Sequence, residues 1–169
     1  VLHDVGKVGT SDTILLKPGK LTAEEFERIK QHASFGGDAL RSMDREIAGR
    51  SFLTIGKEIA SFHHERWDGT GYPAGLRGDR IPLSARIVAL ADVYDALTSK
   101  RPYHDAKEHE EAMNIIASER GTHFDPDVVD VFLAEQETFQ RIRKWENLQE
   151  HPETIDDLIG GPRRTGTAP

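Results

Sequence analysis

The chain of 169 residues contains no cysteine. Disulfide-stapled scaffolds, thiol nucleophiles and cysteine-ligated zinc or iron–sulfur sites are therefore excluded, and any metal ion must be bound by histidine, aspartate or glutamate. The chain also lacks an apolar run near the roughly 20 residues that a membrane span requires, and no signal peptide opens it. We therefore predict no membrane span and a cytoplasmic location.

Positive charge is also scarce, because 22 Lys and Arg residues stand against 29 Asp and Glu residues, for a net charge of −7. Binding to duplex nucleic acid needs a basic surface, so this balance argues against it. An anionic substrate stays open, since bound divalent cations can reverse the sign of the local field. The length fits one domain with its own core.

The two ends of the chain lack the features of a complete domain. Val1 and Leu2 are apolar, follow no Met and run into His3 and Asp4 without an N-cap residue, which indicates a fragment cut inside or beside a helix. Residues 151–169 end in a polar stretch broken by glycine and proline, GGPRRTGTAP, which is typical of disorder. We expect one domain over residues 1–150, an upstream segment that is missing, and a disordered tail.

The apolar periodicity is helical and predicts an all-α fold. In the first third of the chain we expect a buried helix end closed by Gly6 or Gly9, a loop over residues 10–21 with a short extended segment, a helix begun by the capping box of Thr22 and Glu25, and a second short helix capped by Ser34. Further along, we expect helices over residues 51–64, 82–98, 108–119, 125–133 and 134–150, with Asp125 capping the fourth. A long glycine-rich loop over residues 65–82 separates the first two, and its length and aromatic residues favour an ordered, functional loop.

Polar side chains interrupt the apolar pattern at His3 and Asp4, at His63 and His64, and at Asp92. Taken singly, each is most simply a satisfied polar core residue or a helix cap, because a buried charge must neutralise or find a partner. Their occurrence together in a chain without cysteine favours a metal site. Imidazole with carboxylate is the ligand set of Fe, Mn, Zn and Co.

Two further charged residues stand at helical spacing from these candidates. Lys7 lies three and four residues after Asp4 and His3, so its ammonium could hold a phosphate oxygen beside the metal, although an ordinary surface lysine is the alternative. Asp95 lies three residues after Asp92 and could orient a ligand or accept a proton from water. The alternative for Asp95 is a salt bridge to Arg86 or Arg101.

The loop aromatics Trp67 and Tyr72 offer faces on which a nucleobase could stack, and a role as loop anchors is the alternative, preferred for Trp67. Two metals about 3.5–4 Å apart could clamp a phosphodiester and activate a water. The physics of metal-dependent phosphodiester hydrolysis is thus consistent with these residues.

Several segments together resemble the HD-GYP domain, a branch of the HD phosphohydrolase superfamily. They are HDxGK at 3–7, LLKPGKLT at 15–22, His32, HHExxDGxGYP at 63–73, ADVYDALTSxRPY at 91–103 and GTHFDPDVVDVF at 121–132. The string from the paired histidines to GYP is highly specific, and the resemblance covers about residues 2–134. It implies an HD-domain helical bundle with an ordered GYP loop.

The resemblance also implies a bacterial phosphodiesterase that hydrolyses cyclic di-GMP to linear pGpG, with GMP as an optional further product. The implied metal ligands are His3, Asp4, His32, His63, His64 and Asp92. Asp4 would bridge two ions of iron or manganese. The implied substrate contacts are Lys7 near the scissile phosphate, Arg101 and position 104 at phosphate, and Gly71, Tyr72 and Pro73 in the signature loop. Relatives usually follow a receiver or sensor domain, while a homodimer and a diguanylate-cyclase-type signalling partner stay open.

Two departures from the family pattern affect these expectations. Some members take further Glu and His ligands from a helix upstream of the HD pair, and that helix is not in this sequence, so a third metal cannot be assigned and activity of the fragment is open. His104 stands where a phosphate-binding Lys is often found, which would weaken the substrate grip and make it pH-dependent. The alternatives are a hydrolase of another cyclic nucleotide and a catalytically weak module that senses nucleotide or binds a partner.

Overall fold

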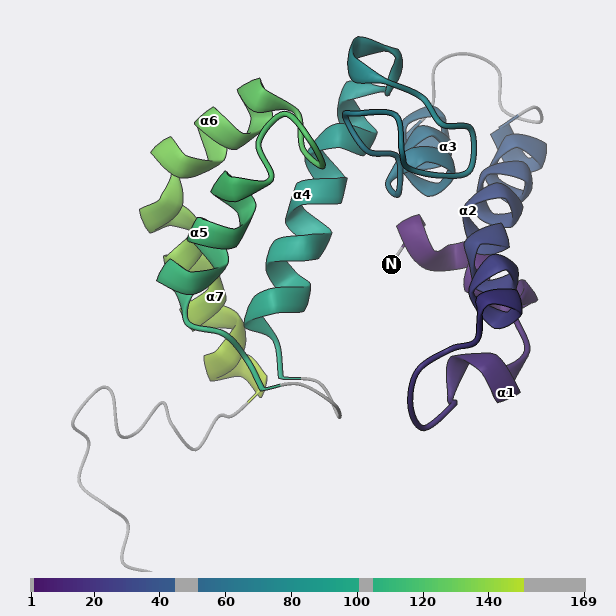
Figure 1. The fold of residues 1–169 in the computed structure, drawn as a ribbon, viewed down its shortest axis with the longest axis horizontal. Coiled ribbons are helices and arrows are strands. Elements are labelled where there is room, and N and C mark those ends of the chain that lie inside the picture. The colour runs from purple at the N-terminus through teal and green to yellow at the C-terminus, as the bar shows by residue number, and fades with distance from the viewer. Residues whose placement is uncertain (1, 45–51, 101–104, 151–169) are drawn as a thin grey trace, which may run out of the picture. The chain divides into compact units, whose positions relative to one another are not determined.

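The computed structural model describes residues 2–44, 52–100 and 105–150, with side chains described as far as residue 145 (Figure 1). The helices are the 3-10 helices η1 (Leu2–Gly9) and η2 (Gly78–Arg80) and the α-helices α1 (Asp12–Leu15), α2 (Ala23–Asp44), α3 (Phe52–Phe62), α4 (Leu83–Thr98), α5 (His109–Ser118), α6 (Pro126–Ala134) and α7 (Gln136–Glu150). An isolated β-bridge joins Arg120 and Phe124, and no strand occurs in the described ranges. The predicted all-α class is confirmed.

The chain divides into two compact units, Val1–Val131 and Phe132–Pro169. In the first unit η1, α2 and α3 pack on one another, and α4 contacts both α3 and α5 (Figure 1). In the second unit the rings of Phe132 and Phe139 meet edge to face, with centroids 4.6 Å apart. No helix within the described ranges is both long and apolar enough to cross a bilayer.

Small residues allow η1, α2 and α3 to approach closely. A methyl group added at Gly6 would lie 1.9 Å from the carbonyl oxygen of His32, and one at Gly37 would lie 2.0 Å from Oγ of Ser61. Gly6 has no room for a side chain because the atom it would meet belongs to the backbone, whereas at Gly37 the hydroxyl of Ser61 would have to rotate away and the Cβ of Ser61 would still lie 3.1 Å from the added methyl group. This close approach brings the start of the chain against the middle of α2, where His32 lies.

Helix α2 confirms one prediction and corrects another. Its N-terminus is a capping box, in which the backbone N–H of Thr22 donates to a carboxylate oxygen of Glu25 at 2.7 Å and the backbone N–H of Glu25 donates to Oγ1 of Thr22 at 3.2 Å. The predicted second helix capped by Ser34 is wrong, because α2 continues to Asp44 and leaves Ser34 exposed on its surface. The buried packing of Gly36 and Gly37 outweighs their poor helix propensity.

Two local predictions near the N-terminus also need correction. The segment that contains His3 is a 3-10 helix, and it ends at Gly9, which was one of the two predicted ends. It is not the buried helix end that was predicted, because Leu2 is 42% exposed. The segment expected to be extended forms the single-turn helix α1, whose N-cap Ser11 accepts a hydrogen bond from the backbone of Thr13. At α6 the prediction is confirmed, since the carboxylate of Asp125 accepts the backbone N–H of Asp127 at 2.9 Å.

Candidate metal centre

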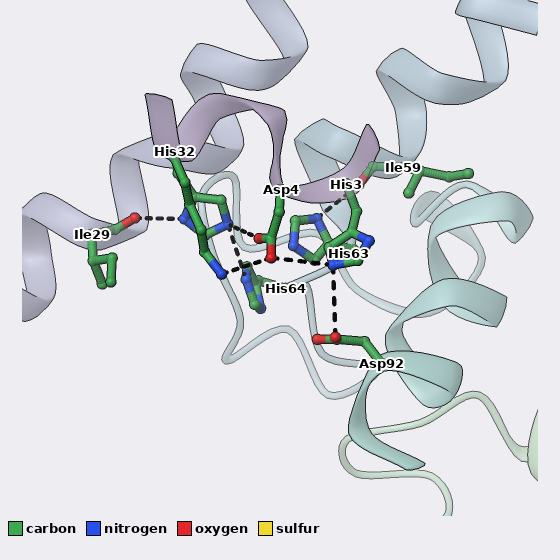
Figure 2. Close-up of polar contacts among 9 residues, drawn as sticks. His3, Asp4, Ile29, His32, Ile59, His63, His64 and Asp92 are labelled. Carbon is green, nitrogen blue, oxygen red and sulfur yellow. Dashed lines mark hydrogen bonds and ion pairs between the residues drawn. The ribbon is translucent and has the colours of Figure 1, made fainter. Parts of the chain in front are cut away.

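The candidate ligands come from four segments that are distant in the sequence and meet in the first unit. Figure 2 shows the six side chains gathered around Asp4, and they are His3 and Asp4 of η1, His32 of α2, His63 and His64 directly after α3, and Asp92 of α4. The carboxylate of Asp4 lies 3.3 Å from Nε2 of His3 and 3.6 Å from Nε2 of His32. Nε2 of His3 lies 3.7 Å from Asp92. The six candidate ligands therefore lie close together, and their role in metal binding stays a prediction.

Three of the histidines form the inner part of this cluster. One ring nitrogen from each of His32, His63 and His64 lies within 4.8 Å of the others. The Nε2 atoms of His32 and His64 are 3.2 Å apart, which is about the separation of two imidazole nitrogens bound to one ion at 2.0–2.1 Å. Without an ion, this contact requires an N–H on one of the two rings.

Hydrogen bonds to the backbone fix the orientation of two of these rings. Nδ1 of His32 bonds the carbonyl of Ile29, and Nδ1 of His63 bonds the carbonyl of Ile59 at 2.9 Å (Figure 2). A carbonyl accepts only, so each Nδ1 carries the proton and each Nε2 keeps its lone pair. Backbone anchoring of the second ring nitrogen is typical of metal-binding histidines.

The Nε2 atom of His63 is the most informative atom in the cluster. It is buried and has no hydrogen-bond partner within the described part of the chain, and the whole residue is 2% exposed. Buried polar atoms in folded proteins nearly always have a partner, and an orphaned one requires an explanation. A lone pair that points into a cluster of imidazoles and carboxylates fits a metal ion.

The protonation states suit a cation as well. Burial, followed by the neighbouring charges of His63 and His32, lowers the pKa of His64 to about 3, and burial also lowers the pKa of His63. Burial alone would raise the pKa of Asp4, but the hydrogen bond and charge of Lys7 outweigh this effect and hold that pKa below its usual value. At neutral pH His63 and His64 are therefore neutral and Asp4 is ionised, and these are the forms that bind metals.

Lys7 and Asp95 occupy different surroundings. Nζ of Lys7 lies 2.7 Å from the carboxylate of Asp4, so its ammonium is beside the cluster, as the helical spacing predicted. Asp95 is exposed and accepts a hydrogen bond from Oγ of Ser99 at 3.0 Å. Arg86 pairs with Asp125 at 2.6 Å. Arg101 and His104 lie outside the described residues, so their predicted roles stay predictions.

The GYP segment packs directly on the cluster. The ring of Tyr72 stacks on His64 with centroids 4.7 Å apart, and its backbone N–H donates to the carbonyl of His64 at 3.2 Å. Burial raises the pKa of Tyr72 to about 12, and the charges of Asp4 and Asp92 add to this effect. A methyl group at Gly71 would lie 2.3 Å from the backbone nitrogen of Arg66, so this glycine lets the loop fold back on itself.

Comparison with known proteins identifies the family to which this fold belongs. The family model described as HD domain matches residues 1–128. The chain belongs to the HD domain family. Over 141 residues it is 58% identical to a Vibrio cholerae protein named cyclic di-GMP phosphodiesterase, an alignment that covers 83% of this chain and 29% of the relative. Over 142 residues it is 44% identical to 3'3'-cGAMP-specific phosphodiesterase 2 of the same organism, covering 84% and 26%.

A solved structure agrees on the fold of this HD domain. The crystal structure of a cyclic GMP-AMP specific phosphodiesterase of V. cholerae, V-cGAP3, superposes with a TM-score of 0.53 at 23% identity and covers 93% of this chain and 38% of that one. The chain spans less than a third of the length of the two curated relatives. The HD-GYP resemblance of the motifs is confirmed by these relatives.

Sequence reasoning missed Glu65, which holds the GYP loop of the HD domain in place. Glu65 is 2% exposed, and its two carboxylate oxygens accept the backbone N–H groups of Ala74 at 2.7 Å and Leu76 at 3.0 Å. The acidic residue directly after the paired histidines was available as a signal, but a loop has no periodicity that identifies a buried side chain. Trp67 has the contacts of a loop anchor, since its backbone N–H donates to the carbonyl of His123 at 3.0 Å and the guanidinium of Arg86 lies over its ring.

Proposed function

We propose that this HD domain is a metal-dependent phosphodiesterase that hydrolyses cyclic di-GMP in the bacterial cytoplasm, giving linear pGpG and, as an optional further product, GMP. The single observation that carries the proposal is the buried Nε2 of His63, which has no hydrogen-bond partner in the described part of the chain and lies in a cluster of imidazoles and carboxylates. The relative named cyclic di-GMP phosphodiesterase supports the choice of substrate.

We propose two divalent ions, iron or manganese, held by the six residues of the cluster. The carboxylate of Asp4 lies between His3 and His32, with one oxygen nearest each ring, and this placement suits a carboxylate that bridges two ions. When bound, such ions supply a nucleophile from water at neutral pH and neutralise the charge of the phosphodiester. Asp92, which lies 3.7 Å from the same Nε2 atom of His3 that faces Asp4, completes the set.

The surrounding residues would bind and orient the substrate. The ammonium of Lys7 is held against Asp4 and has further N–H groups to donate to a phosphate oxygen. The phenol of Tyr72 stays protonated at neutral pH, because its pKa is about 12, so it acts as a donor, and its ring shields His64 from water. Asp95 is proposed to accept a proton from water.

The remaining proposed substrate contacts come from the signature loop and from the segment after α4. Gly71 and Pro73 flank Tyr72 and would lie beside the bound dinucleotide. Arg101 and His104 would contact its phosphates. We further propose that the domain works with an upstream receiver or sensor domain, and that a homodimer or a contact with a diguanylate-cyclase-type protein links it to signalling.

A second candidate substrate is 3'3'-cGAMP, which the 44% identity to a phosphodiesterase named for it favours. The same ligand set would serve both dinucleotides, so the difference must be measured on products. A nucleotide-sensing module without turnover is the outcome expected if the ions bind and neither dinucleotide is cut.

The test is a hydrolysis assay on protein purified anaerobically with iron or manganese, with products separated by chromatography. We expect conversion of cyclic di-GMP to pGpG, a loss of about 100-fold or more in Asp4→Asn, and full activity in Asp38→Asn, which removes an exposed carboxylate paired with Arg41 on α2. Metal-loaded protein that cuts no cyclic dinucleotide would overturn the proposal.

A further inference from the structure

A cavity of about 370 Å³ lies between α2 and the GYP loop. It is lined by four residues of α2 and two of the loop, namely Glu27, Lys30, Gln31, Ser34, Tyr72 and Pro73. The four helix positions follow the i, i+3, i+4, i+7 spacing, so they share one face of α2. Because the ring of Tyr72 also stacks on His64, this residue belongs to both the cavity and the candidate metal centre.

The lining of the cavity includes a pair of opposite charges, in which the Glu27 side chain is exposed to solvent. Nζ of Lys30 lies 2.6 Å from a carboxylate oxygen of Glu27. The same ammonium lies over the rings of Phe26 and Tyr72, at 4.9 Å and 5.4 Å from their centroids, and such cation–π contacts hold a lysine in place. The cavity thus presents one cationic donor and one anionic acceptor beside an aromatic and a proline wall.

We propose that this cavity binds a guanine base of the substrate and makes Glu27 and Lys30 determinants of base specificity, an inference that rests on the proposed function. Guanine presents two adjacent N–H donors, N1 and N2, next to the acceptor O6, with N7 as a second acceptor. The carboxylate of Glu27 accepts the two donors, and the ammonium of Lys30 donates to O6. Proteins recognise unpaired nucleotide bases by hydrogen bonds to the donors and acceptors on the edges of the base.

The charge pattern favours guanine over the other parts of a dinucleotide and over adenine. A phosphate would meet the negative carboxylate of Glu27, so the anionic backbone belongs on the side of Lys7 and the cluster. Adenine has one donor group on this edge, the N6 amino group, beside the acceptor N1. It can therefore donate to one oxygen of the Glu27 carboxylate, whereas guanine donates to both oxygens. Hydrogen bonds to charged groups are the stronger ones, and the missing bond lowers affinity.

The test is isothermal titration of the metal-loaded chain with cyclic di-GMP and with cyclic di-AMP. In Glu27→Gln and Lys30→Met we expect the dissociation constant for cyclic di-GMP to rise about 10-fold, and that for cyclic di-AMP to change by less than about 3-fold. Glu24→Gln removes the same charge from α2 at a position outside the six lining residues, and its affinities should equal those of the unmodified chain.

Two kinds of result would overturn the assignment of the cavity. In the first, the variants lose the same affinity for both dinucleotides or lose none for either. In the second, the unmodified protein binds the two dinucleotides equally or binds neither. Hydrolysis is measured separately on the same samples. A chain that binds cyclic di-GMP through Glu27 and does not cut it would refute the proposed function and leave the guanine site standing, so the two failures can be told apart.

Discussion

Replacing Glu65 by Gln tests whether one buried carboxylate fixes the GYP loop. In the native chain its two oxygens accept the N–H groups of Ala74 and Leu76. Gln has one oxygen and one NH₂ group, so one buried backbone N–H would face another donor. Leaving a buried donor unsatisfied costs about 1–3 kcal/mol. At about 2–4 °C per kcal/mol for a chain of this size, the melting temperature should fall by about 2–12 °C.

The effect should be centred on the loop, because both bonded N–H groups belong to it. We expect the near-ultraviolet circular dichroism of Trp67 to change and the KM for cyclic di-GMP to rise, since Tyr72 shares the loop. Metal content should stay at the native level, because Glu65 is not among the six candidate ligands. This split between binding and metal content marks a positioning residue.

The matched control is Glu110→Gln, which removes an exposed carboxylate in the first turn of α5. Its melting temperature should lie within about 2 °C of the native value, since surface substitutions usually change stability by less than about 0.5 kcal/mol. An unchanged melting temperature in Glu65→Gln would refute the bonding role. Loss of metal in step with stability would show that Glu65 supports the whole cluster and not the loop.

Three further changes test the packing, the site and the electrostatics. Gly6→Ala should lower the free energy of unfolding by about 3 kcal/mol or more in urea titration, because the added methyl group would lie 1.9 Å from a backbone oxygen of α2. In Gly9→Ala the methyl group would meet only a side chain, at 3.2 Å, so the loss of stability should be smaller. Lys7→Ala should keep metal and lose turnover, and Asp4→Asn should lose both. Burial lowers the pKa of His123 from 6.5 to about 4. Between these two pH values the unfolded chain binds more protons than the folded chain, so stability should fall as the pH falls from about 6.5 to about 4. This fall should be less steep in His123→Gln.

Each of these has a contrary outcome. Equal destabilisation by the two glycine substitutions would show that η1 does not press on α2 as described. Equal metal loss in the lysine and aspartate variants would remove the division of their roles. An identical pH profile in the histidine variant would place His123 in contact with water in the folded state.

Five of the six candidate ligands could be identified from the sequence because they are polar residues within apolar segments, whereas His32 was suggested only by the family resemblance. His3, His63 and Asp92 stand out for that reason, and the paired histidines to GYP form a specific string. Their convergence around Asp4 then follows from the fold, in which η1, α2 and α3 pack together. The structure adds the backbone hydrogen bond made by Nδ1 of His63, and it shows that the buried Nε2 of this residue has no hydrogen-bond partner among the described residues.

The continuous helix α2 was not predicted, because local signals and tertiary packing disagree there. Ser34 and the adjacent glycines read locally as a helix break, while burial of Gly37 against Ser61 stabilises a continuous helix. The charged cavity was missed for a related reason. In the sequence Glu27 and Lys30 look like an ordinary solvent-exposed pair at helical spacing. Only the position of Tyr72 in the fold makes them part of the lining of a cavity.

The most direct test is the metal content of His63→Gln beside that of His123→Gln, measured by plasma mass spectrometry on anaerobically purified protein. His63 is buried and His123 is half-buried, and of the two only His63 has a buried Nε2 without a hydrogen-bond partner among the residues that the structure describes. We expect the native chain and His123→Gln to hold iron or manganese and His63→Gln to lose it while staying folded by circular dichroism. A native chain without metal, or a His63→Gln variant with the native amount, would contradict the proposed metal centre.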